Sequence, residues 1–181
     1  MKNKDRLQIV LLLVLSIFLF IFILDGSKLY TISKKNLESD AVDFLLKYVP
    51  EDQSDTKLIV DKKTKSSHLL VFKTGDTYTA VTYNKSLLFN LYTRDSVYYN
   101  IEKLNHYKVH QDNNRSHITY DISKDDDNIK INIDSKTSNQ IFYNSIYAVI
   151  CFAIVISSVT LQVTNLSLTR KAIFQVKSFG Y

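Results

Sequence analysis

The chain has 181 residues with one cysteine and three glycines, which excludes an intramolecular disulfide and a glycine-rich phosphate-binding loop. Its formal net charge of +5 lies entirely in two short flanks, because residues 25–140 include 17 basic and 17 acidic side chains. A neutral middle segment gives no electrostatic basis for nucleic-acid binding, which depends on neutralising phosphates. The many Lys, Asn, Ile and Tyr residues suggest an AT-rich, bacterial genome.

The first predicted element is a transmembrane helix over residues 7–24, after a short amino-terminal flank, residues 1–6. This segment contains no charged residue and consists almost entirely of Leu, Ile, Val and Phe. Eighteen helical residues rise about 27 Å, which is just enough to cross the hydrocarbon core of a bilayer. A cleaved signal peptide is the alternative, but its apolar region is normally shorter and is followed by small residues. We therefore expect an uncleaved anchor.

A polar domain is predicted for residues 25–140, and it begins with a linker and one helix. Residues 36–49 have apolar side chains at helical spacing, and Ser33 or Asn36 is placed to cap the start. Pro50 is expected to end the helix. The predicted apolar stripe consists of Leu37, Ala41, Phe44, Leu45, Tyr48 and Val49.

After Pro50 the apolar period changes to two, which is typical of strands. The predicted strands are residues 57–61, 68–74, 77–83, 87–93, 97–102, 117–123 and 128–134. Residues 103–111 fit either a strand or a loop. Short polar breaks, including residues 94–96, separate the strands and favour an antiparallel meander. The predicted fold class is α+β, with one helix packed on a curved sheet of five to seven strands.

The second predicted transmembrane helix covers residues 141–166, which also contain no charged residue. A basic tail, residues 167–181, follows it. Because the excess positive charge lies in residues 1–6 and in the tail, the positive-inside rule places both ends in the cytoplasm. The central domain is then extracytoplasmic, in a two-pass protein of the plasma membrane.

One side of the second span is predicted to bind a partner. Its small and hydroxylated residues, which allow close helix approach in lipid, form what we call the small-residue stripe. The stripe consists of Ala153, Ser157, Thr160 and Thr164. Two alternatives are open: the stripe packs on residues 7–24 of the same chain, or it docks on another membrane protein.

No catalytic, metal or cofactor site is predicted. His106 and His110 have a spacing that metal sites use on helices, but no nearby Cys or paired carboxylates complete a ligand set. The four histidines are expected to be exposed. Asp125, Asp126 and Asp127 lack the alternation and glycine of a calcium loop, so a solvated hairpin turn is expected. No serine has the glycine context of a nucleophile elbow.

The tyrosines crowd the predicted strands, where core packing is the simplest interpretation. Tyrosine is also enriched at protein interfaces, and Tyr98 and Tyr99 are therefore predicted to contact a partner.

The leading functional hypothesis is a non-catalytic accessory subunit of a larger membrane complex, such as a transporter, secretion or signalling assembly. Its partners would be the bilayer and a larger integral membrane protein, or a second copy of the chain. The alternative is a membrane-anchored sensor that binds a small ligand on its sheet. An envelope enzyme is a third, weaker hypothesis, because the sequence shows no clustered polar site.

Overall fold

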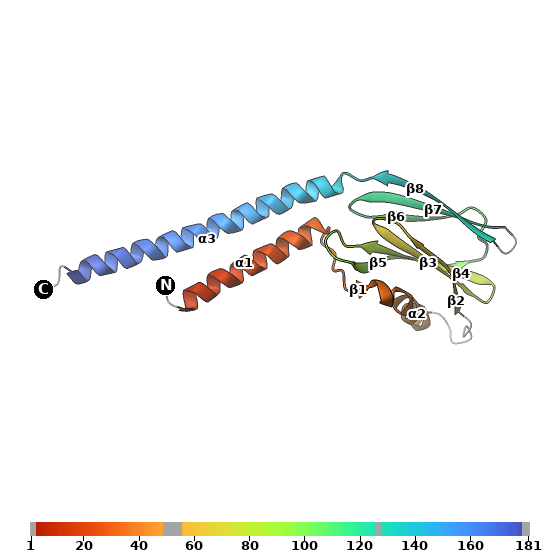
Figure 1. The fold of residues 1–181 in the computed structure, drawn as a ribbon, viewed down its shortest axis with the longest axis horizontal. Helices are drawn as coiled ribbons and strands as arrows, with labels where there is room; N and C mark the ends of the chain where they lie inside the picture. Colours follow the sequence, from red (N-terminus) through yellow and green to blue (C-terminus); the bar gives the residue numbers. More distant parts are fainter. Residues whose placement is uncertain (1–2, 49–55, 126–127, 179–181) are drawn as a thin grey trace. The chain divides into compact units, whose positions relative to one another are not determined.

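The computed structural model describes residues 3–48, 56–125 and 128–178, in two compact units (Figure 1). One unit contains the two long helices, α1 (Asn3–Leu24) and most of α3 (Gln140–Ser178). The other unit is the domain Asp25–Ile141.

Both long helices include a segment long and apolar enough to cross a bilayer, Leu7–Leu24 in α1 and Gln140–Gln162 in α3. Helix α3 continues for 39 residues to Ser178, well beyond the predicted end of the second span at residue 166. Residues 167–178 of the predicted basic tail belong to this helix, and neither proline nor glycine occurs between residues 140 and 178 to interrupt it.

The domain is α+β with antiparallel meander sheets, and it contains two sheets where one curved sheet was predicted. A five-stranded sheet has the order β1-β5-β4-β3-β2, and a three-stranded sheet has the order β6-β7-β8. Every neighbouring pair is antiparallel. The strands are β1 (Ile32–Ser33), β2 (Thr56–Lys63), β3 (Ser67–Thr74), β4 (Thr77–Lys85), β5 (Leu91–Ile101), β6 (Tyr107–Asp112), β7 (Ser116–Asp125) and β8 (Asn128–Thr137).

The predicted helix is present as α2 (Leu37–Tyr48), after a 3-10 turn over Lys34–Asn36. Leu37, Ala41 and Leu45 are buried, as the helical spacing predicts, whereas Tyr48 is exposed. Of the two predicted caps, the Ser33 hydroxyl makes no capping hydrogen bond. Val49 and Pro50, the predicted end of the helix, lie outside the described residues.

One long strand, β5, replaces the two strands predicted at residues 87–93 and 97–102. The polar run Arg94–Asp95–Ser96 was interpreted as a turn, but it continues the strand because all three side chains find partners. The pairing with β4 shifts register here, between Thr82↔Ser96 and Tyr83↔Arg94, which leaves Asp95 as the extra residue of a bulge. This bulge explains the run of polar residues that suggested a break between two strands.

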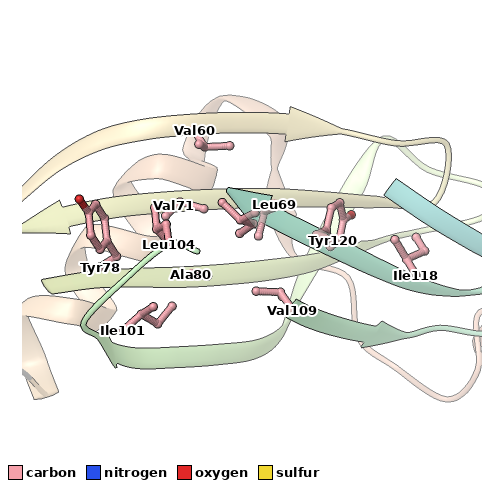
Figure 2. Close-up of a cluster of buried hydrophobic side chains, with 11 residues drawn as sticks. Val60, Leu69, Val71, Tyr78, Ala80, Ile101, Leu104, Val109, Ile118 and Tyr120 are labelled. Carbon is pink, nitrogen blue, oxygen red and sulfur yellow. The ribbon is translucent and has the colours of Figure 1, made fainter. Parts of the chain in front are cut away.

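The domain has three layers: α2, the five-stranded sheet and the three-stranded sheet. Alternate residues of β3 point to opposite sides, with Leu69 and Val71 toward the three-stranded sheet and Leu70 and Phe72 toward α2. The core between the sheets is shown in Figure 2. It consists of Val60, Leu69, Val71, Tyr78, Ala80, Ile101, Leu104, Val109, Ile118, Tyr120 and Ile122. Strand β3 is buried on both faces, which explains its continuous apolar run.

Candidate interaction surfaces

The structure places the small-residue stripe on the exposed surface of α3. Ala153, Ser157, Thr160 and Thr164 are all exposed, and the three hydroxyls donate hydrogen bonds to carbonyls four residues earlier. These bonds satisfy the hydroxyls within the helix, so the side chains need no external polar partner in lipid. The stripe is therefore a surface of short side chains whose hydroxyls already have hydrogen-bond partners within the helix.

The contact with α1 uses a different side of α3. Ala148 and Asn144 are buried, and the Phe152 ring lies 5.7 Å from the ring of Phe20 in α1, measured between centroids. On α1 the buried residue is Ser16. At 3.6 residues per turn, the four stripe residues lie about 80–140° around the helix axis from Phe152. The structure thus does not bring the stripe to the first apolar helix.

Tyr98 and Tyr99 point to opposite faces of β5, so they do not form one surface. The Tyr98 hydroxyl donates to the carbonyl of His110, 2.6 Å away, and its ring packs against the core between the sheets. Tyr99 is exposed on the α2 side, where its ring stacks on Phe44 with 6.5 Å between centroids. Tyr99 is the more exposed of the two, and Tyr98 is partly buried.

Most of the other tyrosines of the strands are core residues. Tyr83, Tyr92 and Tyr120 are fully buried. Burial raises the pKa of Tyr83, and the hydrogen bond to the carboxylate of Asp40 raises it further, since an anionic tyrosine would lose its donor role. The hydroxyls of Tyr83 and Tyr120 have hydrogen-bond partners inside the domain.

Asp40, Tyr83 and Arg94 join α2 to the five-stranded sheet. The Tyr83 hydroxyl donates to Asp40 Oδ2 at 2.8 Å, and an Arg94 nitrogen lies 2.8 Å from the same oxygen. The Arg94 guanidinium also lies 4.0 Å from the ring centroid of Phe44, a cation–π contact. Asp40 lies outside the predicted apolar stripe, so helical spacing did not signal this role.

Each of the three exposed histidines contacts a neighbouring polar side chain. His106 contacts Asp121, His110 contacts Thr119 and His117 contacts Asp112. No group of three His, Cys, Asp or Glu side chains placed to hold an ion occurs among the described residues. Asp125 pairs with Asn128 at the β7–β8 turn, while Asp126 and Asp127 lie outside the part of the chain that the structure describes.

His68 is buried, contrary to the expectation that all four histidines are exposed. Its Nε2 contacts Asp61, whereas its Nδ1 has no hydrogen-bond partner among the described residues. The His68 ring lies 5.8 Å from the ring of Tyr92, centroid to centroid, and the Tyr92 hydroxyl is likewise buried without a partner there. Burying polar atoms without partners costs free energy, so this pair requires an explanation.

The first residues of the domain, which were predicted as a linker, are held to the rest of it by hydrogen bonds. Asp25 is 6% exposed, and its carboxylate accepts hydrogen bonds from the Ser86 hydroxyl and from the backbone N–H of Leu87 at 2.6 Å. Tyr30 donates to the Asp25 carbonyl at 3.2 Å. Burial, with the nearby Asp25 charge, raises the pKa of Tyr30 to about 12.

The point where the chain leaves the domain adjoins the point where it enters. The Ile141 N–H donates to the Asn114 carbonyl at 3.0 Å. Gly26, at φ +77°, lies so close to the Asn114 side chain that an added Cβ would be 1.8 Å from Asn114 Nδ2. One residue of the β6–β7 turn thus contacts both connections to the long helices.

No protein-family model, curated protein or solved structure matches this chain.

Proposed function

We propose that this protein is a non-catalytic accessory subunit of a larger membrane complex, anchored by α1 and α3. The observation that carries the proposal is the small-residue stripe, which is exposed and lies on a different side of α3 from Phe152, the residue that contacts α1. Association in lipid gains nothing from removing water, so it depends on close packing of small residues. A stripe left free by the helix of its own chain is suited to a helix of another protein, or of a second copy.

The stripe is tested by adding bulk to it. Replacing both Ala153 and Ser157 by leucine should keep the helix inserted, since leucine favours lipid. Loss of close approach should weaken association with partners by about 1–2 kcal/mol. The measurement is recovery of partners after gentle solubilisation of full-length protein at equal expression.

The matched controls are Ile154→Leu and Ile156→Leu, which lie outside the stripe and should leave recovery unchanged. If the Ala153/Ser157 variant retains every partner, and residues 25–141 alone capture them equally well, α3 serves only as an anchor. The subunit proposal would then depend on the domain.

We also propose that both termini are cytoplasmic and that the domain is outside the membrane, as the basic flanks favour. After Cys151→Ser, a membrane-impermeant thiol reagent should label a cysteine placed at Lys130 in intact cells but not one placed at Ser178. Lys130 is exposed on β8. The opposite labelling pattern would reverse the orientation.

A second candidate function, binding of a small polar ligand, is favoured by the buried, unpartnered atoms of His68 and Tyr92. If they hold a ligand, native mass spectrometry of the purified protein should detect an added mass that Tyr92→Phe abolishes and the exposed control Tyr99→Phe retains. If each of the three proteins has only the mass of its own polypeptide chain, a retained ligand is excluded.

A further inference from the structure

The turn between β4 and β5 presents three consecutive large apolar side chains. Leu87, Leu88 and Phe89, called here the apolar loop, are 36%, 53% and 49% exposed. Residues 87–89 were predicted as the start of a strand, but β5 begins only at Leu91. An exposed apolar cluster on an otherwise well-packed domain marks an interaction surface.

The apolar loop is held in place by Asp25, the first residue of the domain. Asp25 accepts the Leu87 N–H at 2.6 Å and the Ser86 hydroxyl, and Ser86 in turn accepts the Phe89 N–H at 3.1 Å. Ser86 and Asp25 are both buried. These hydrogen bonds order the loop backbone before any partner binds, while the three side chains remain outside.

Asp25 directly follows Leu24, the last residue of the apolar segment Leu7–Leu24. If α1 crosses a bilayer, Asp25 lies where the hydrocarbon gives way to the headgroups. The Leu87 backbone, one hydrogen bond from the Asp25 carboxylate, must lie close to that boundary. Leucine and phenylalanine gain free energy at this depth by leaving water, and the ordered backbone loses little entropy.

We propose that the apolar loop inserts into the lipid–water interface beside the end of α1, as a third membrane contact of the chain. The inference rests on the proposed membrane anchoring by α1. The occupant is the acyl boundary of the bilayer itself, and it requires no protein partner.

Tryptophan fluorescence tests this directly, because the sequence contains no tryptophan and one introduced indole reports alone. Full-length Phe89→Trp and, separately, Leu88→Trp are reconstituted in phosphatidylcholine vesicles in which part of the lipid has brominated acyl chains. Bromine quenches an indole only in contact with the chains. We expect both emissions to fall as the brominated fraction rises, with bromine near the headgroup quenching more than bromine deep in the bilayer.

Two control positions separate the possible failures. Tyr99→Trp, exposed near the far end of β5 and about 25 Å along the strand from Leu91, should not be quenched. Phe18→Trp, exposed within α1, should be quenched most by deep bromine. Quenching at Phe18 without quenching at residues 88 and 89 overturns the loop insertion and leaves the anchoring intact.

Absence of quenching at Phe18 overturns the anchoring and the loop insertion with it. Equal quenching at residues 89 and 99 would mean that the whole domain adheres to lipid, which also overturns a specific role for the apolar loop. Quenching at residues 88 and 89 in vesicles without other proteins supports lipid rather than a protein as the occupant.

Discussion

Replacing Phe72 by alanine should lower the free energy of unfolding of residues 25–141 by about 4 kcal/mol, the usual range for a buried phenylalanine being about 3–5 kcal/mol. Phe72 lies on the central strand β3, is 1% exposed and packs in the layer between the sheet and α2. Strands surround β3 on both edges, so the cavity cannot collapse easily. Urea unfolding followed by circular dichroism measures the loss.

Phe89→Ala is the matched control, since it deletes the same side chain from an exposed position. In the soluble fragment it should change the free energy of unfolding by less than about 0.5 kcal/mol. Similar losses for both variants would mean that Phe72 is not part of a packed layer. They would contradict the three-layer description of the domain.

Asp40→Ala should destabilise the same fragment by about 2–3 kcal/mol, because it removes a charged acceptor shared by a buried tyrosine and an arginine. Tyr83 retains the Leu37 carbonyl at 3.1 Å as a weaker acceptor, and Arg94 is partly solvated, which limits the loss. The lost free energy should come mainly from weaker packing of α2 on the five-stranded sheet.

Asp43→Ala tests whether position on the helix matters, because Asp43 is on the same helix but exposed. We expect it to change the free energy of unfolding by less than about 0.5 kcal/mol. Double-mutant cycles of Asp40→Ala with Tyr83→Phe and with Arg94→Ala then measure each coupling. Coupling near zero in both cycles would show that these groups act independently, in disagreement with their shared oxygen.

Much of the secondary structure was predictable because its signals are local. The stripe of Leu37, Ala41 and Leu45 has the period of a helix, and β7 and β8 alternate cleanly. The split of β5 was the main error. A bulge at Asp95 with side-chain partners on other elements has the same sequence appearance as a turn, because those partners, Lys28 and Asn84, are distant in the chain.

The division into two sheets was not predictable from strand periodicity. Alternation identifies two faces of a strand but does not say which neighbour covers each face. β6, ambiguous in the sequence, pairs with β7 and starts the second sheet. The two-residue strand β1 was missed because it is too short to show any period.

The candidate surfaces were predictable only in part. The small-residue stripe follows from helical spacing, but its position relative to α1 depends on which residues of α3 approach that helix. The apolar loop was hidden because its three apolar residues extend naturally into the strand that follows. The burial of Asp25 depends on Ser86, 61 residues away, and no local pattern signals that pairing.

The meeting of Gly26, Asn114 and Ile141 has a consequence for the long helices. The two chain segments that connect the domain to α1 and α3 start within a few side chains of one another, so association of these helices is intramolecular at a high effective concentration, of millimolar order for short linkers. The pair therefore needs little intrinsic affinity. The folded domain keeps the starting points of the two helices close together, so α3 can use most of its surface for other contacts.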